Sequence, residues 1–306
     1  MLFHRQIRSK WMHTIQRKQA LCGSKIFAIR NYSLALTRGV PNSFIEALSS
    51  CSDPNNPIQV ERAKSQHDLY EQHLRTKLYT VSLPPSESYP DCPFIEDTVV
   101  ALQKKIVINR IGAPSRQGEV DDVKNLVQNL GMEVVDMRTE SEGATCDGGD
   151  VMVPSKTGVS PKHLFVGLSD RTNEEGVEIL KKSFQSNVQV IAVPSLGDSL
   201  HLKTVITHLD EHTLIAPKNS LGKEMIQAVG AKKLGYQIIE LPDPKMCNLV
   251  SVNGLVLAAE TECEETISVL EQAIKERNME IQYLNMNEFA KCDGSFTCLS
   301  VLLNLD

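Results

Sequence analysis

The order of strands and helices is the feature of this sequence that most restricts its fold. Short runs rich in Val, Ile and Leu come in pairs or triplets, and a single amphipathic helix separates one group from the next. This pattern is typical of a mixed α/β fold and differs from the strict alternation of a doubly wound sheet. Roughly four or five strand-strand-helix-strand units fit the length of the chain.

The pattern predicts the positions of individual elements. The expected helices cover 56–80, Glu119–Leu130, Glu174–Phe184, Leu221–Ala228 and Glu264–Arg277. The expected strands are 78–83, 98–103, 105–110, 132–137, 151–154, 163–169, 188–194, 213–217, 237–242, 249–259, 280–285 and 296–304. Connections are short and no linker rich in Gly, Ser or Pro follows residue 60, so we expect one compact domain over residues 32–306.

Composition narrows the class of protein further. Hydrophobic residues make up 41% of the chain and charged residues 23%, as expected for a globular protein with a proper core. No run of eighteen or more apolar residues occurs, so no membrane span is expected. The net charge of -6 argues against a general nucleic-acid binder. Eight cysteines without a CxxC pair favour a reducing compartment with free thiols.

The N-terminal segment differs in charge from the rest of the chain. Residues 1–45 contain eight basic residues and no Asp or Glu. Four apolar residues recur at every fourth position, as on one face of a helix: Phe3, Ile7, Trp11 and Ile15. We interpret residues 1–31 as a basic extension of the mitochondrial transit-peptide kind, which predicts a cytoplasmic or mitochondrial protein. The alternatives are a disordered basic tail, or translation that begins at Met12.

One acidic stretch could bind a cation. In YPDCPFIEDTVV, Asp91, Glu96 and Asp97 lie close together and lead directly into a strand. Such carboxylates repel one another unless a cation compensates them. A guanidinium ligand held by bidentate hydrogen bonds would do so. A solvated acidic loop is the simpler interpretation of this stretch alone.

Three further stretches carry residues of nucleophilic catalysis. The glycines of TCDGGDVMV predict a tight turn with positive φ that leaves Asp147 and Asp150 beside it, although a plain turn explains them equally well. His201 lies between two leucines, where a core histidine is the commoner case. Cys298 opens an apolar run, where most cysteines are passive core residues. Cys, His and a carboxylate are nevertheless the usual nucleophilic set.

Six stretches in order resemble one family. YPDCPFIEDTVV, GAPSR, DGGDV, FVGLSDRTN, LHLKT and FTCLSVLLN together are similar to the dimethylarginine dimethylaminohydrolases of the guanidino-modifying (pentein) superfamily. The resemblance covers residues from about 38 to 304. It implies a five-bladed α/β propeller of repeated ββαβ units with pseudo-fivefold symmetry, and an active site in the central channel.

The resemblance also implies roles for individual residues. Cys298 would be the nucleophile, His201 the general acid and base, and Asp147 the carboxylate that orients His201. The residues expected to bind the substrate are Asp91, Glu96, Asp97, Arg116, Arg171, Leu48 in the lid region, and Cys292. No cofactor or metal is expected, and the implied partner is a small molecule, a methylated arginine. The oligomeric state stays open.

The implied reaction converts N-omega-methylated arginines into citrulline and an amine through a thiouronium on Cys298. In this family the reaction removes methylarginines that inhibit nitric oxide synthase. One alternative is an arginine deiminase, which uses the same chemistry on arginine but usually carries an extra helical insertion. A second is a non-catalytic propeller that serves as a binding module, against which the presence of all three catalytic residue types argues. The chain departs from the family at Ser199, where glycine is common, and at Leu299, where some members have a second cysteine.

Overall fold

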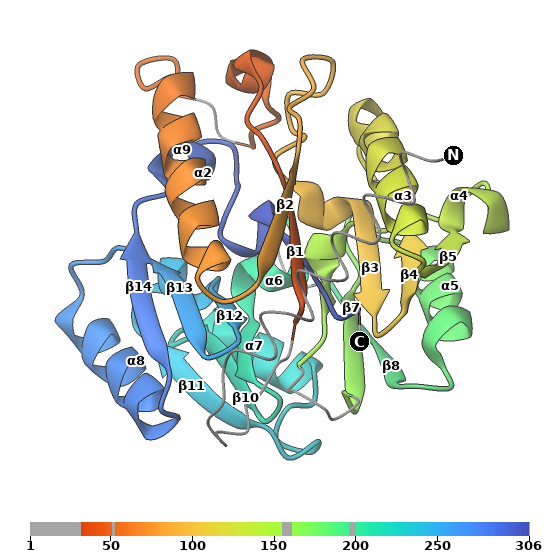
Figure 1. Cartoon of the computed structure of the whole chain (residues 1–306). Coiled ribbons are helices and arrows are strands. Elements are labelled where there is room, and N and C mark those ends of the chain that lie inside the picture. The colour runs from red at the N-terminus through yellow and green to blue at the C-terminus, as the bar shows by residue number, and fades with distance from the viewer. Residues whose placement is uncertain (1–31, 51–52, 155–160, 196–199, 306) are drawn as a thin grey trace, which may run out of the picture.

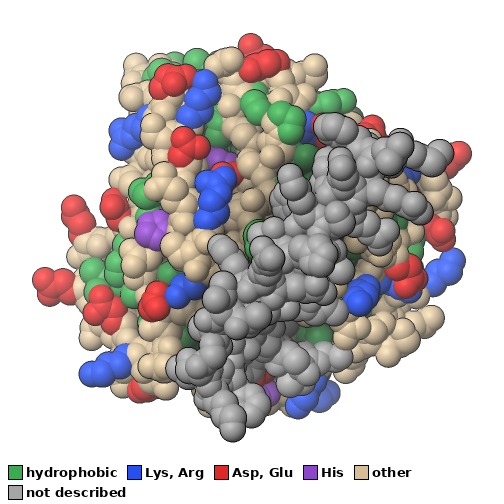
Figure 2. All heavy atoms as spheres, viewed as in Figure 1, with side chains coloured by type: hydrophobic (Ala, Val, Ile, Leu, Met, Phe, Trp, Pro, Cys, Tyr) green, Lys and Arg blue, Asp and Glu red, His purple; other side chains and the backbone are tan. Residues whose placement is uncertain are grey.

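The computed structural model describes residues 32–50, 53–154, 161–195 and 200–305. The predicted transit-peptide segment 1–31 and Ser199 lie outside the described residues, so the expectations about them stay predictions. None of the described helices combines the length and the apolar composition needed to cross a bilayer. On the face shown in Figure 2, acidic and basic side chains are interspersed over the described surface.

The described elements are as follows. The strands are β1 (Leu34–Arg38), β2 (Tyr79–Leu83), β3 (Val99–Leu102), β4 (Lys105–Ile108), β5 (Glu133–Asp136), β6 (Val151–Met152), β7 (His163–Gly167), β8 (Gln189–Val193), β9 (Thr207–Asp210), β10 (Thr213–Pro217), β11 (Gln237–Leu241), β12 (Val250–Val252), β13 (Leu255–Ala259), β14 (Glu280–Leu284) and β15 (Val301–Leu303). The α-helices are α2 (Val60–Arg75), α3 (Val120–Asn129), α4 (Met137–Glu140), α5 (Glu174–Phe184), α6 (Leu202–Val205), α7 (Ser220–Ala228), α8 (Glu264–Glu276) and α9 (Asn287–Ala290). The 3-10 turns are η1 (Asn42–Glu46), η2 (Ile95–Thr98), η3 (Pro114–Glu119), η4 (Gly148–Asp150), η5 (Pro244–Cys247) and η6 (Thr297–Leu299).

The strands of the described residues form five three-stranded sheets with one shared pattern. In each sheet a central strand pairs antiparallel with one neighbour and parallel with the other. The antiparallel pairs are β15–β1, β3–β4, β6–β7, β9–β10 and β12–β13; the parallel pairs are β1–β2, β4–β5, β7–β8, β10–β11 and β13–β14. A helix joins the two parallel strands of each sheet, because parallel neighbours cannot be joined by a tight turn. The predicted α/β class is therefore confirmed.

The helices pack their apolar faces onto the sheets. Val120, Val123 and Val127 of α3 lie in one buried cluster with Ile106 and Ile108 of β4. The apolar side chains of α5 pack on β7 in the same way. Each such side chain, when fully buried, stabilises the fold by about 1.5–3 kcal/mol. Figure 1 shows α2, α3, α5 and α8 at the periphery of the molecule, which leaves the antiparallel edge strands toward its interior.

Three predicted segments are wrong in detail. The predicted strand 249–259 is a hairpin, because Asn253 and Gly254 adopt φ values of 47° and 83° and reverse the chain. The predicted strand 296–304 begins at Val301, since Thr297–Leu299 form a 3-10 turn. The predicted helix 56–80 is shortened to α2. Two strands, β1 and β9, have no counterpart among the predicted elements.

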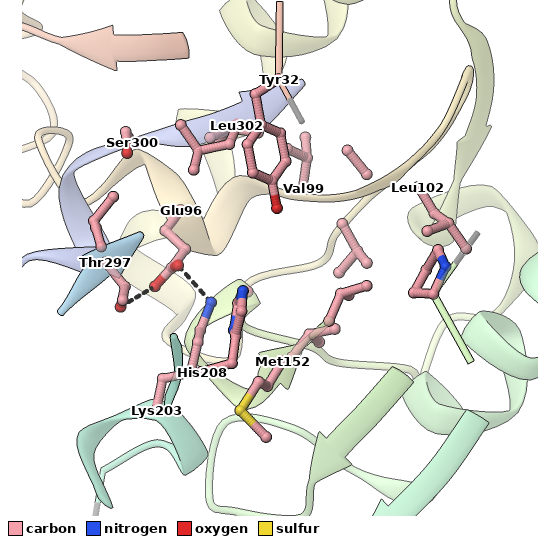
Figure 3. A pocket seen from close by; sticks show the side chains of 18 of the residues that line it. Tyr32, Glu96, Val99, Leu102, Met152, Lys203, His208, Thr297, Ser300 and Leu302 are labelled. Atoms are coloured by element: carbon pink, nitrogen blue, oxygen red, sulfur yellow. Dashed lines mark hydrogen bonds and ion pairs between the residues drawn. The ribbon is translucent and has the colours of Figure 1, made fainter. Parts of the chain in front are cut away.

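The antiparallel edge strands of the five sheets surround a common cavity. It has a volume of about 540 Å³ and is lined by residues of β3, β6, β9, β12 and β15. Figure 3 shows Val99, Met152 and Leu302 around it, with Glu96 and Lys203 at its base. All five sheets therefore meet around one cavity in the interior.

Candidate active site

Short helical turns carry most of the predicted site residues. The turns η2, η4, α6 and η6 directly precede the edge strands β3, β6, β9 and β15, with one connecting residue at most. Glu96 and Asp97 lie on η2 and Cys298 on η6, while Asp147 and His201 are the residues that cap the N-termini of η4 and α6. The turns contact one another in the pairs η2–η6, η2–η4 and α6–η4. The fold thus gathers side chains from four sheets.

His201 is buried, and Asp147 fixes its ring. Nε2 of His201 lies 3.1 Å from Oδ2 of Asp147, whose other oxygen accepts the Gly112 N–H at 2.8 Å. Burial disfavours the charged imidazole, but three carboxylates outweigh it and raise the pKa of His201 to about 9. They belong to Asp97, Asp147 and Asp150. His201 therefore holds a second proton at neutral pH, as a general acid requires.

Asp97 forms a buried ion pair with Arg116. Nη1 of Arg116 lies 2.8 Å from Oδ2 of Asp97, and the other oxygen accepts the Gly149 N–H at 2.9 Å. Burial opposes the charge on Asp97, but His201 and Arg116 outweigh it and lower the pKa of this carboxyl. Arg116 also pairs with Glu119 at 3.0 Å. Its guanidinium thus compensates carboxylates of the protein itself.

Glu96 lies on the site turn η2 and also lines the cavity. Its carboxylate is ion-paired with Lys203 and accepts a hydrogen bond from Oγ1 of Thr297 at 2.9 Å, as the dashed lines of Figure 3 show. All three residues line the cavity, whereas Cys298 and His201 are not among its lining residues. Burial raises the pKa of Glu96, and Lys203 opposes that effect. The cavity therefore extends to Glu96, Lys203 and Thr297 next to the site.

The thiol of Cys298 is protonated in the free protein. Burial raises its pKa to about 12, helped by the negative charges of Glu96 and Asp97 and opposed by Lys203. The residue is held in its turn by a hydrogen bond from its N–H to the Ser295 carbonyl at 3.2 Å. A cation that compensates the two carboxylates would lower this pKa.

Asp91 lies in a second part of the site. One of its oxygens accepts the backbone N–H of Leu48 at 3.0 Å, while the Leu48 side chain is exposed. Burial raises the pKa of Asp91, and the positive charges of Arg116 and Arg171 oppose that rise. Arg171 therefore lies within electrostatic reach of Asp91, and both belong to one charged region.

Cys292 lies within electrostatic reach of Asp91. The residue is buried in the hydrophobic core, and its sulfur lies 3.3 Å from the Phe289 carbonyl oxygen. Burial raises the pKa of this thiol, and the charge of Asp91 adds to the effect. The structure thus brings Cys292 next to the site, with its own hydrogen bond directed into the core.

The glycines of the DGGD turn have a steric role. Neither Gly148 nor Gly149 has a positive φ, so the predicted left-handed turn is wrong. A Cβ on Gly148 would lie 1.9 Å from the Glu96 carbonyl oxygen, and one on Gly149 would lie 2.6 Å from Nδ1 of His201. Only glycine lets η2 and the imidazole approach this closely.

The same turns could hold a cation by geometry alone. Ligand atoms of Asp97, Asp147 and His201 lie within 4.8 Å of one another. Arg116 and two backbone N–H groups already bind the carboxylate oxygens. The charges of this cluster are therefore compensated by the protein.

Comparison with known proteins decides the family. The family model described as N,N dimethylarginine dimethylhydrolase, eukaryotic, matches residues 40–298. The chain belongs to the dimethylarginine dimethylaminohydrolase family. Members are hydrolases of carbon–nitrogen bonds in amidines, and the family lies within the pentein superfamily.

Relatives of this family cover more than two thirds of the chain. The chain is 29% identical to the N(G),N(G)-dimethylarginine dimethylaminohydrolase of Pseudomonas aeruginosa over 87% of its length and 97% of the relative. It is 33% identical to the putative hydrolase DDAH2 of Homo sapiens over 69% of its length and 71% of the relative. A solved Pseudomonas aeruginosa structure in complex with citrulline covers 89% of the chain and 99% of its own, with a TM-score of 0.75 and 25% identity.

Two residues next to the candidate site were not predicted. Lys203 holds Glu96, and Asn248 donates to Oγ1 of Thr297 at 3.2 Å. Lys203 lies inside the LHLKT stretch on α6, the short helix that directly follows His201, so its position next to the site could have been inferred from that motif. Nothing local marks Asn248, which follows η5.

Proposed function

We propose that this chain hydrolyses N-omega-methylated arginines to citrulline and dimethylamine or methylamine, with Cys298 as the covalent nucleophile. The observation that carries the proposal is the convergence of η2, η4, α6 and η6, which gathers carboxylates, a protonated imidazole and a thiol. Related structures have been solved with citrulline and with S-methyl-L-thiocitrulline, which supports an arginine derivative as ligand.

Binding of the substrate activates the nucleophile in this proposal. A guanidinium is a delocalised cation whose N–H groups match carboxylate acceptors. Placed against Glu96 and Asp97, it compensates the charges that raise the pKa of Cys298. The thiol then gives its proton to the solvent, because His201 already carries two protons, and the thiolate forms where its target lies. Arg171 supplies positive charge for the substrate carboxylate, and Arg116 holds Asp97 in place.

The covalent steps then follow from the two ionisation states. The sulfur of Cys298 attacks the guanidinium carbon and forms a tetrahedral adduct. His201 gives its proton to the departing dimethylamine, and a thiouronium remains on the sulfur. His201, now neutral, takes a proton from water as the water adds to the same carbon. The carbon–sulfur bond breaks, citrulline leaves, and Asp147 keeps the imidazole oriented throughout.

We further infer that the five sheets are the blades of a five-bladed propeller with pseudo-fivefold symmetry, formed by residues 32–306 as one catalytic domain. Two observations support this inference. The five sheets share one strand pattern, and the antiparallel edge strand of each contributes to the common cavity. The turns that carry the site then occupy equivalent positions in different blades.

Citrulline release by purified protein tests the proposed function. We expect the wild type to convert asymmetric dimethylarginine into equal amounts of citrulline and dimethylamine. Cys298→Ser should lose at least about 1,000-fold in kcat, because the nucleophile is removed. Cys263→Ser is the matched control, since Cys263 is a partly exposed thiol at the N-terminus of α8.

Two results would contradict the proposal. Unchanged turnover in Cys298→Ser would exclude this residue as nucleophile. A higher kcat/KM for arginine than for dimethylarginine, with release of ammonia, would indicate the deiminase reaction instead.

Mass spectrometry of acid-quenched reactions should detect a covalent adduct on wild-type protein.

A further inference from the structure

Asp150, the last residue of the DGGD turn, has no part in the proposed chemistry. It nevertheless lies next to the residues that do, because it binds the backbone directly after His201. Its side chain is fully buried on η4. Oδ1 accepts the backbone N–H of Leu202 at 2.9 Å. Oδ2 accepts the hydroxyls of Ser169 and Thr172 at 2.6 and 2.7 Å. One carboxylate therefore binds three groups from two other segments.

The first tether reaches the general acid. Leu202 directly follows His201, and its N–H is held by Asp150. Gly167 allows this approach, because a Cβ there would lie 2.8 Å from Cβ of Leu202 and 3.2 Å from the Asp150 carboxylate. The backbone that carries the imidazole is thus fixed relative to η4.

The other two tethers reach Asp147 and Arg171. Oγ1 of Thr172 donates to Asp150 and accepts the backbone N–H of Asp147 at 3.0 Å. Oγ of Ser169 donates to Asp150 and accepts the backbone N–H of Arg171 at 3.0 Å. Each hydroxyl uses its proton on the carboxylate, so its lone pairs face the N–H groups. The position of Asp150 therefore sets the positions of both segments.

The electrostatic surroundings agree with such a role. Burial raises the pKa of Asp150, while His201 and the two hydroxyls lower it. The charge of Asp150 in turn contributes to the raised pKa of His201. The buried thiol of Cys146 also lies within electrostatic reach of Asp150. A buried carboxylate without hydrogen bonds would be strongly unfavourable in free energy. Loss of one of the three hydrogen bonds should therefore weaken the arrangement of the others.

We propose that Asp150 is a positioning residue of the reaction, which holds His201, Asp147 and Arg171 in register through Leu202, Thr172 and Ser169. The inference rests on the proposed function, because the proposed function gives His201, Asp147 and Arg171 their roles in the reaction. It goes beyond that function by assigning a task to the second aspartate of the turn. A group that controls both the acid and a substrate-binding arginine should affect kcat and KM together.

Asp150→Asn tests the proposal with little change in volume. The amide cannot accept hydrogen bonds at both ends, so we expect kcat to fall about 100-fold, as for a misplacement of the order of 1 Å. KM should rise through Arg171. Loss of the Asp150 charge should also lower the pKa of His201, measured by NMR titration of the imidazole without substrate. Asp170→Asn is the matched control, because Asp170 is exposed and adjacent to Arg171.

A second pair of variants covers the case in which Asp150→Asn does not fold. Thr172→Val removes the hydroxyl between Asp150 and Asp147, and Thr172→Ser restores it. We expect the valine variant to lose activity and the serine variant to recover most of it. Folded variants with wild-type kcat, KM and His201 pKa would overturn the proposal. Absence of turnover in the wild type would instead count against the proposed function, and the NMR titration would still test the role of Asp150.

Discussion

Cys298 and His201 both hold protons at neutral pH in the free protein. Burial is the main cause of the thiol pKa of about 12, and the negative charge of Asp97 adds to it. The same charge, together with Asp147 and Asp150, raises the pKa of the imidazole to about 9. A preformed thiolate–imidazolium pair is therefore absent before binding. A cationic substrate acts on the two groups differently, since the thiol must lose its proton while the imidazole must keep its own.

The pH dependence of kcat/KM follows from these two values. Below pH 9 both groups are protonated, and the reactive form has lost one proton. We expect kcat/KM for dimethylarginine to rise about tenfold per pH unit between pH 6 and 8 and to level off near pH 9. Initial rates at low substrate concentration and constant ionic strength measure this. A flat profile over that range would show that a reactive ion pair exists before binding.

Folding stability provides the control for this experiment. The pKa of His201 is raised on folding, so its contribution to stability is complete below its ordinary value of 6.5 and is lost as the pH rises through about 9. This stability change is opposite in direction to the expected gain in rate. A rise in kcat/KM therefore cannot come from a larger folded fraction through this group, and urea unfolding at each pH checks it.

At the scale of an element, the turn from Asp147 to Asp150 gives each of its four residues a different contact. Asp147 binds His201, and Asp150 binds the backbone that follows His201. Gly148 lies against the Glu96 carbonyl, and Gly149 lies against the His201 ring while its N–H binds Asp97. Four residues thus define the geometry of two other turns.

Gly149→Ala should therefore harm catalysis more than it harms the fold. The added methyl would lie 2.6 Å from Nδ1 of His201, so the imidazole must move. We expect kcat to fall about 100-fold. Gly143→Ala is the control, since its Cβ would meet only the carboxylate end of Glu175. Assays of citrulline release and thermal unfolding should be compared; equal losses of activity in both variants would contradict the assignment.

The sequence was informative about elements with strong local patterns. α5 begins and ends at the predicted residues, because Asn173 caps it and apolar residues line one face. β9 was missed, since THLD is short and follows the isolated stretch around His201. The turn around Cys298 was predicted as strand because it opens an apolar run, whereas the structure has a 3-10 turn there that contacts η2. Asn248 was missed because its hydrogen bond to Thr297 is a tertiary contact that no local pattern records, and the same holds for the three hydrogen bonds of Asp150.

At the scale of the whole molecule, the first sheet is completed by residues from opposite ends of the described chain. β15 pairs antiparallel with β1, and the Leu305 N–H donates to Oγ of Ser33 at 2.9 Å. Val301 and Leu303 are buried at this junction. The first sheet is therefore completed by strand pairing between distant parts of the chain, without a covalent link.

A circular permutant tests this strand pairing. We expect a chain in which residue 305 is joined to residue 32 by a short Gly-Ser linker, with new ends between Lys232 and Lys233, to fold and to keep activity within a few-fold. Both lysines are exposed, and the cut lies between α7 and β11, far along the chain from the site turns. Urea unfolding and citrulline release measure the outcome. A permutant cut between Asp147 and Gly148 is the control that should be inactive.

The pairing of β1 with β15 also has a consequence for synthesis on the ribosome. Ser33 and Leu303 lie 270 positions apart along the chain. At typical rates of translation, the edge of β1 that pairs with β15 therefore stays unpaired for roughly tens of seconds. An unpaired edge strand can pair with other chains, so we expect the nascent protein to be prone to association during this interval. Cys298 emerges just before β15 and long after η2 and η4. Translation therefore completes the carboxylates of η2 and η4 before Cys298, the proposed nucleophile, is made.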